Sequence, residues 1–217
     1  MLHFPSQTKI PSNEKEAFDF RAHDRRNPRL TRTLIATIYN GDILEVDADA
    51  LIYSTNVMLN CTGGVGGALM MRYGPSIQQQ LHATLNEPLH GPRFATQGDV
   101  IRLPIREISY AEIFHTVPCD ALYRTTPEIV EAILHRCLSD CEKTTAIRSI
   151  ALSALGCGYG DFDLEQFLRS ANQVFQQTQW PGIDSVTIAI PDVYFFKSAQ
   201  EQNETEQLAY HFSHPPE

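Results

Sequence analysis

Short apolar runs alternate with longer amphipathic stretches through most of the chain. Runs rich in β-branched residues, each followed by polar or glycine-rich residues, predict strands over 34–39, 50–53, 99–103, 112–117, 149–152 and 185–190. Apolar residues at helical spacing predict helices over 67–73, 76–85, about 127–142 and 163 to about 178. Strands that alternate with helices in this way predict an α/β fold with a largely parallel sheet.

Two glycine-rich segments follow predicted strands. The first spans residues 61–67 and precedes a predicted helix, and the second spans residues 156–160. Glycine lets backbone N–H groups approach an anion closely, and the start of a helix adds partial positive charge. Ligands of parallel sheets bind beyond the carboxyl ends of the strands. The pattern therefore predicts one cleft that binds a diphosphate between two glycine loops.

The length of 217 residues suits one domain with extensions. We expect a polar N-terminal extension over 1–32, a domain over 33–198 and a polar C-terminal tail over 199–217. The net charge is −9, but the extension holds seven basic and four acidic residues, which leaves ten basic and 22 acidic residues for the remainder. This balance argues against nucleic-acid binding except through the basic extension, for which a solvated arm is the simpler interpretation.

Composition also bears on location. No apolar run is long enough to cross a membrane, and the first residues have no apolar core of a secretory signal. Five cysteines without a CxxC pair indicate free thiols in a reducing compartment, so we expect an intracellular, cytoplasmic protein. Cys137 and Cys141 stand four residues apart, but two buried thiols are a simpler interpretation than a metal site. The sequence implies neither a metal nor a cofactor.

Several motifs occur in the order that is typical of the macro domain, the ADP-ribose-binding module. Residues 41–43 read GDI, residues 54–56 read STN, and residues 59–69 read LNCTGGVGGAL. Further on, residues 113–117 read IFHTV and residues 151–162 read ALSALGCGYGDF. The chain thus resembles a macro domain, which implies a three-layer α/β/α sandwich around a mixed, largely parallel sheet of six or seven strands.

The resemblance also implies how ADP-ribose, free or attached to a protein, would bind. The Asp42 carboxylate would accept from the adenine amino group, the Ile43 N–H would donate to the ring, and Asn56 would bind the distal ribose. The remaining residues would line the ribose and wrap the diphosphate, and they are Gly63, Gly64, Val65, Gly66, Ser153, Gly156, Cys157, Gly158, Tyr159 and Gly160. An aspartate before a helix can also serve only as an N-cap.

One departure from the family pattern concerns catalysis. Macro domains that hydrolyse ADP-ribosyl esters carry Asp in a GGVDG loop, where this chain has Gly66, and Met70 replaces a nearby His. The loop GGVGGAL is similar to that of the macro-type histone variants, which are readers. We therefore expect binding, with hydrolysis of mono-ADP-ribosylated proteins, O-acetyl-ADP-ribose or ADP-ribose-1″-phosphate as the alternative. The catalytic candidates for this alternative are Asn56, Asp161 and His115.

Two further alternatives stay open at this point. A scaffold for poly(ADP-ribose) or nucleic acid would use the basic residues of the N-terminal extension. The aromatic ring over the distal ribose would be Tyr159, Phe162 or neither, and the apolar residues 193–195 would either stack on adenine or pack within the domain.

Overall fold

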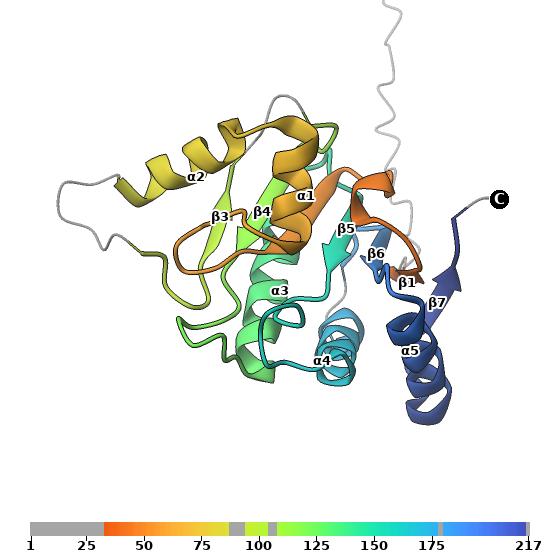
Figure 1. Cartoon of the computed structure of the whole chain (residues 1–217). Coiled ribbons are helices and arrows are strands. Elements are labelled where there is room, and N and C mark those ends of the chain that lie inside the picture. Colours follow the sequence, from red (N-terminus) through yellow and green to blue (C-terminus); the bar gives the residue numbers. More distant parts are fainter. Residues whose placement is uncertain (1–32, 87–93, 104–107, 178–179, 216–217) are drawn as a thin grey trace, which may run out of the picture. The chain divides into compact units, whose positions relative to one another are not determined.

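One sheet of seven strands runs through the part of the chain that the computed structural model describes, residues 33–86, 94–103, 108–177 and 180–215 (Figure 1). In chain order the strands are β1 (Ile35–Tyr39), β2 (Ala50–Ser54), β3 (Val100–Arg102), β4 (Glu112–Thr116), β5 (Ser149–Ser153), β6 (Ser185–Ala189) and β7 (Tyr210–Ser213). Their order across the sheet is β3-β4-β2-β5-β6-β1-β7, and only the β3–β4 pair is antiparallel. The predicted mixed, largely parallel sheet is confirmed.

Helices cover both faces of this sheet (Figure 1). The 3-10 helix η1 (Ile43–Glu45) and the helices α1 (Gly64–Tyr73) and α2 (Ser76–Asn86) pack on one face. The helices α3 (Pro127–Glu142), α4 (Leu164–Gln177) and α5 (Val193–Glu206) pack on the other face. The result is the predicted three-layer α/β/α arrangement.

Strand β2 shows why the central strands read as continuous apolar runs. Successive side chains of a strand point to opposite faces of the sheet. Ala50 and Ile52 therefore join the core beneath α3 and α4, whereas Leu51 and Tyr53 join the core beneath α1 and α2. Both faces are buried, so neither set of positions can be polar.

The C-terminal residues differ from the expected polar tail, because the boundary expected at residue 198 falls inside α5 and the last strand pairs in parallel with β1. Asp192 starts α5 by accepting from the N–H groups of Tyr194 and Phe195. Phe196 is buried in the core, and the Tyr210 hydroxyl donates to the Leu168 carbonyl at 2.8 Å. A few well-placed side chains therefore hold a mostly polar segment. The expected extension over 1–32 lies outside the described residues.

Candidate functional site

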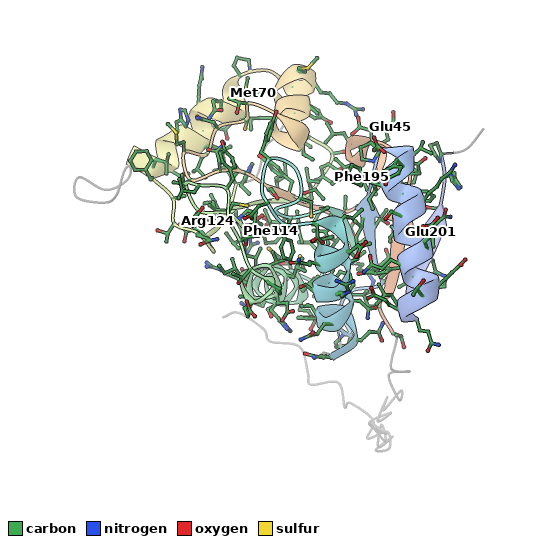
Figure 2. All side chains as sticks on the ribbon, turned by 60° about the horizontal axis from the view of Figure 1, so that its bottom comes forward. Glu45, Met70, Phe114, Arg124, Phe195 and Glu201 are labelled. Carbon is green, nitrogen blue, oxygen red and sulfur yellow. The ribbon has the colours of Figure 1, made fainter. Side chains whose placement is uncertain are left out.

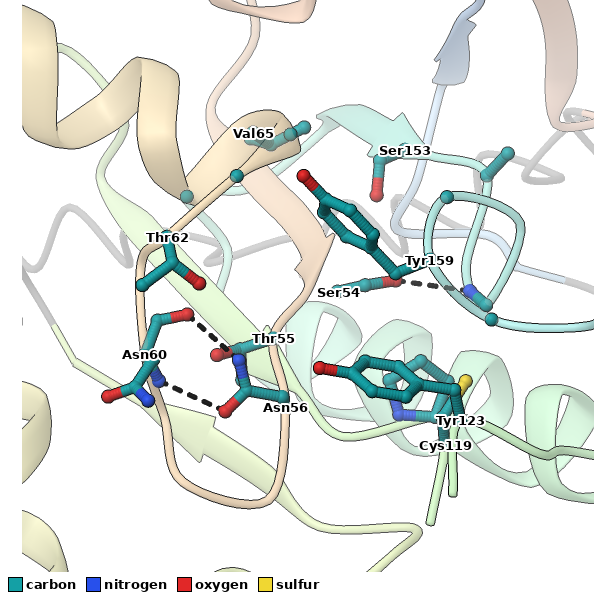
Figure 3. Close-up of a pocket in the computed structure, with 18 of the residues that line it drawn as sticks. Ser54, Thr55, Asn56, Asn60, Thr62, Val65, Cys119, Tyr123, Ser153 and Tyr159 are labelled. Atoms are coloured by element: carbon teal, nitrogen blue, oxygen red, sulfur yellow. Dashed lines mark hydrogen bonds between the residues drawn. The ribbon is translucent and has the colours of Figure 1, made fainter. Parts of the chain in front are cut away.

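A cavity of about 410 Å³ opens beyond the carboxyl ends of β2, β4 and β5 (Figure 3). This is the edge of a parallel sheet at which ligands are expected. The cavity is lined by Ser54, Thr55, Asn56, Asn60, Thr62, Gly63, Gly64, Val65, Gly66, Pro118, Cys119, Asp120, Tyr123, Ser153, Ala154, Gly156, Gly158, Tyr159 and Gly160. Both predicted glycine segments are therefore part of one cavity, as expected.

The first glycine loop, residues 61–67, leads into α1. Gly64 has a φ of 51°, in the left-handed region that favours glycine, and Gly63 provides no side-chain cap. The Gly67 N–H donates to the Gly63 carbonyl at 3.0 Å, which is the first bond of the helix. The N–H groups of the preceding helical residues, Gly64, Val65 and Gly66, have no carbonyl one turn back. They are donors at the positive end of α1, on the wall of the cavity.

Side chains outside this loop fix its shape. The Gln78 amide on α2 accepts from the Cys61 N–H at 2.6 Å and donates to the Leu59 carbonyl at 2.7 Å. The Asn56 oxygen accepts from the N–H groups of Met58 and Asn60, and its Nδ2 donates to the Asn60 carbonyl (Figure 3). Asn56 thus shapes the loop and keeps one N–H of its amide for a ligand.

The second glycine loop, residues 156–160, is held by close backbone contacts. Gly156 has a φ of 80°, and its N–H donates to the Ser54 hydroxyl at 3.2 Å. A Cβ atom at Gly160 would lie 2.2 Å from the Gly156 oxygen and 2.7 Å from the Cys119 sulfur. Within the described part of the chain, the N–H groups of Gly158, Tyr159 and Gly160 have no protein acceptor. Backbone donors of both loops therefore border the same cavity.

The segment 118–125 supplies a third wall of the cavity, which sequence reasoning missed, and its lining residues are Pro118, Cys119, Asp120 and Tyr123. The Asp120 carboxylate accepts from the N–H groups of Leu122 and Arg124 and from the Arg124 guanidinium. The third wall is joined to the segment after the second loop, because the Asp161 N–H donates to the Tyr123 carbonyl at 3.0 Å. Gln97 Nε2 donates to the carbonyls of Pro118 and Arg124. Asp120 was the signal in the sequence that could have indicated this turn, since Asp often caps such turns.

Tyr159 reaches from the second loop across to the first. A Cβ atom at Gly63 would lie 2.6 Å from the Tyr159 hydroxyl, so the two residues are in close contact. The Tyr159 ring lies 6.5 Å from the ring of Tyr123, on the same side of the cavity (Figure 3). Phe162 is buried in the core instead. Of the two aromatic residues considered from the sequence, Tyr159 lines the cavity.

The cavity contains little charge. Asp120 is the only ionisable carboxylate among the lining residues that the structure describes, and no Lys or Arg lines it. The N–H of Arg124, and with it the Leu122 N–H and the Arg124 side chain, holds the pKa of Asp120 below its usual value. Burial raises the pKa of the Cys119 thiol to about 11, with Asp161 and Asp120 adding to the rise, so this thiol is protonated at neutral pH.

Two of the catalytic candidates lie outside the cavity lining. His115 is buried, and its Nδ1 lies 2.6 Å from the Tyr53 hydroxyl. Burial lowers the pKa of His115 to about 4, against a smaller opposing effect of the Leu103 backbone, so the ring is neutral near pH 7. The Asp161 carboxylate accepts from the Thr125 N–H at 3.3 Å. Asn56 does line the cavity.

Three of the expected ligand-binding residues also lie outside the lining. Asp42 Oδ1 caps η1 by accepting from the Leu44 N–H at 3.0 Å, and the Ile43 side chain is buried. Cys157 is half-buried, and its sulfur donates to the Leu155 carbonyl at 3.6 Å. Asp42 follows β1, which lies three strands from β2 in the sheet, or about 14 Å at the usual strand spacing. Asp42 therefore caps η1 through one carboxylate oxygen, and its second carboxylate oxygen stays available to a ligand.

Apolar residues follow β6 at the same edge of the sheet. Val193, Tyr194 and Phe195 are all more than half exposed, and Phe195 lies in the first turn of α5 (Figure 2). The interpretation that they pack within the domain is therefore wrong for these three side chains, while a contact with a base stays a prediction.

The structure contains no group of three or more His, Cys, Asp or Glu side chains arranged to bind a metal within the described residues. All five cysteines are free. None of the helices in the described ranges is both long and apolar enough to span a membrane.

The family model for the macro domain matches residues 52–171. A macro domain-containing protein of Xanthomonas campestris pv. campestris is 29% identical over 178 residues, which cover 80% of this chain and 92% of that protein. An uncharacterized protein of Mycobacterium tuberculosis is 24% identical over 132 residues, which cover 61% of this chain. The chain spans only 34% of the length of this mycobacterial relative.

Solved structures agree with the fold. A variant of the Oceanobacillus iheyensis macrodomain with ADPR has a TM-score of 0.68 at 19% identity and covers 78% of this chain and 92% of its own. The Trypanosoma brucei macrodomain in complex with ADP-ribose has a TM-score of 0.62 at 19% identity, and the match covers 79% of this chain and 68% of that chain. At 19% identity, the likeness to these structures shows the fold alone.

Proposed function

Because this chain belongs to the macro domain family, we propose that its cavity binds ADP-ribose, with the diphosphate between the two glycine loops. Structural neighbours from Oceanobacillus iheyensis and Trypanosoma brucei were solved with ADPR and with ADP-ribose, respectively. We extend this ligand from those proteins to this chain, whose cavity lies at the edge of a parallel sheet at which ligands are expected.

The observation that carries the proposal is the set of backbone donors on two sides of the cavity. Gly64, Val65 and Gly66 present N–H groups at the positive end of α1, and the second glycine loop presents further N–H groups opposite them. Such donors bind phosphate oxygens without cationic side chains. The absence of Lys and Arg among the described lining residues is therefore compatible with an anionic ligand.

Asp42 fixes the proposed direction of the ligand. Its carboxylate lies at the end of β1, three strands from β2, so a molecule that reaches both must run across the ends of β5 and β6. ADP-ribose has an adenosine at one end of its diphosphate and a second ribose at the other. We place the adenine near Asp42, Ile43 and the exposed side chains 193–195, and the terminal ribose near Asn56. Asp42 and Ile43 precede the residues that the family model matches.

Binding without efficient hydrolysis fits the cavity best. General-base catalysis needs a group that can take a proton from water at the ribose. Within the described lining, the only carboxylate is Asp120, and both of its oxygens already accept hydrogen bonds. At Gly66 a Cβ atom would lie 3.1 Å from the Cys61 Cα, so the position of the missing aspartate is also tightly packed. The bond between the terminal ribose and a protein that carries ADP-ribose therefore stays intact in the proposed complex.

Calorimetric titration of the wild type and the Asp42→Asn variant with ADP-ribose tests the proposal. Asparagine keeps one side-chain oxygen, which caps η1 as Asp42 Oδ1 does, but it has no second oxygen for the adenine amino group. We expect selective binding of ADP-ribose over ADP, AMP and NAD. The variant should bind ADP-ribose about tenfold more weakly while its stability is unchanged.

Two controls make this experiment specific. Asp47→Asn changes an exposed carboxylate in the same connection and should leave the affinity unchanged. Inosine diphosphate ribose replaces the amino group with a carbonyl, so Asp42→Asn should not weaken its binding. Wild-type protein that binds none of these nucleotides would contradict the proposed function.

The five free cysteines fit the further proposal of an intracellular, reducing location.

A further inference from the structure

Exposed apolar side chains gather around the mouth of the cavity, on two sides of it. Leu122 and Tyr123 lie in the segment 118–125, and Tyr159 lies in the second glycine loop. Met58 and Phe94 are exposed on segments that are bonded to the Asn60 side of the cavity. These five residues, named here the apolar rim, are between 49% and 77% exposed. Apolar side chains that cluster next to a cavity indicate a surface that a partner covers.

The hydrogen bonds of the neighbouring backbone connect the apolar rim to the cavity. Asn60, which lines the cavity, donates from Nδ2 to the Met58 sulfur at 3.9 Å. The N–H of Ala95, next to Phe94, donates to the Val57 carbonyl at 2.7 Å. On the other side, the Asp120 carboxylate holds the backbone of Leu122 in place. The rim is therefore attached to the walls of the cavity on both sides.

The direction of the bound nucleotide decides what reaches this rim. In the proposed complex adenine lies toward β1, so the terminal ribose points away from β1, toward β2 and β4. The third wall follows β4 and forms that end of the cavity, with Tyr123 on one side and Asn60 on the other (Figure 3). A group attached to the terminal ribose would leave the cavity through the apolar rim.

We infer that the apolar rim is a docking surface for a polypeptide that carries ADP-ribose, and that it contacts apolar side chains beside the modified residue. This inference rests on the proposed binding of ADP-ribose. A free sugar nucleotide in the cavity leaves Met58, Phe94 and Leu122 uncovered, because these three rim residues do not line it, whereas a polypeptide can bury apolar surface there. A nucleic acid would need cations for its phosphates, and Arg124 beside the rim is paired with Asp120 at 3.1 Å.

The test compares four probes by calorimetry with the full chain. They are free ADP-ribose, a serine-linked mono-ADP-ribosylated peptide with leucine and valine beside the modified serine, the same peptide with glycine at those positions, and an ADP-ribosylated DNA oligonucleotide. The wild type should bind the apolar peptide about tenfold more tightly than free ADP-ribose, and the glycine peptide about as tightly as free ADP-ribose.

Two variants assign this preference to the rim. Leu122→Ser removes an exposed side chain that does not line the cavity. It should therefore lower the affinity for the apolar peptide about fivefold and change the affinity for free ADP-ribose less than twofold. Met71→Ser is the matched control, because Met71 is 91% exposed on α1 and outside the rim. It should change neither affinity.

The outcomes separate the two proposals. Equal binding of free ADP-ribose and the apolar peptide would overturn the rim but leave the proposed function standing. Tighter binding of the oligonucleotide than of the peptide would overturn the choice of partner. Failure to bind free ADP-ribose would overturn the proposed function, and the rim with it.

Discussion

The two glycine loops border the same cavity, but different forces fix them. The first loop is held from outside by side-chain amides, chiefly those of Gln78 and Asn56. The second loop folds back on itself so closely that the position of Gly160 leaves no room for a Cβ atom. Glycines in similar motifs therefore meet different structural requirements. Some are required by a neighbouring backbone, and others only allow a ligand to approach.

The largest expected effect on stability comes from the buried contact between Tyr53 and His115, beneath the first loop. Tyr53, which contacts His115, lies next to the position of Gly66, where a Cβ atom would be 3.6 Å from its ring. Burial lowers the His115 pKa from 6.5 to about 4, so between about pH 6.5 and pH 4 the unfolded chain binds a proton at this residue more readily than the folded chain does. The free energy of unfolding should therefore fall by about 3 kcal/mol from pH 7.5 to pH 4 because of this residue.

Urea denaturation at a series of pH values measures this effect. His115→Gln serves as the reference, since carboxylates that titrate in the same range contribute equally to both proteins. The variant should be less stable at pH 7.5 but should lose less stability on acidification. Parallel pH dependences in the two proteins would show that His115 does not carry the effect.

The second loop should be intolerant of a single methyl group. In Gly160→Ala the new Cβ atom would meet the Gly156 oxygen at 2.2 Å and the Cys119 sulfur at 2.7 Å. The loop must shift, and we expect the free energy of unfolding to fall by about 2 kcal/mol. Gly158→Ala is the matched control in the same loop, because a Cβ atom there meets nothing within 4 Å. Equal stabilities of the two variants in urea denaturation would remove the contrast between the loops.

The first loop should instead depend on Gln78. In Gln78→Ala the Cys61 N–H and the Leu59 carbonyl both lose their partner, which should cost about 1.5 kcal/mol of stability. Gln79→Ala changes the exposed neighbour on α2 and should have little effect on thermal unfolding. Equal melting temperatures for the two variants would show that Gln78 does not hold the loop.

The smallest effect has the opposite sign. Gly67 lies within α1, and a Cβ atom there would meet the Thr62 backbone at 3.7 Å, an ordinary contact. Gly67→Ala should therefore stabilise the protein by about 0.5 kcal/mol, because alanine loses less conformational freedom in a helix. A lower melting temperature for this variant would mean that the end of the first loop is as tightly constrained as Gly160.

Much of this architecture could be predicted from local patterns. The apolar runs predict β1 to β6, and the glycine spacing predicts that two loops border one cavity, because period and composition are local properties of the chain. Strand β7 was missed because its four residues, YHFS, lie in a polar segment and do not form the apolar run that marks the other strands. The third wall was missed for a different reason. Its position depends on hydrogen bonds from Gln97 and Asp161, which no short window of sequence contains.

The site residues expected from the resemblance also fall into two groups, those whose place follows from local sequence and those whose place depends on the whole sheet. Glycines of both loops line the cavity as expected, since their place follows from the strand ends. Asp42 lies apart from the cavity as a helix cap, because its distance from β2 depends on the strand order of the whole sheet. Its role toward adenine stays a prediction.

The proposed binding of ADP-ribose depends above all on the backbone donors of both loops, which hold the diphosphate. Two-dimensional NMR of the ¹⁵N-labelled protein during titration with ADP-ribose tests it most directly. We expect downfield amide proton shifts for residues 64–66 and 158–160. Gly98 and Gly182, which do not line the cavity, serve as unshifted references. Saturable binding that leaves both groups of amides unshifted would contradict the account, because the anion would then be held elsewhere.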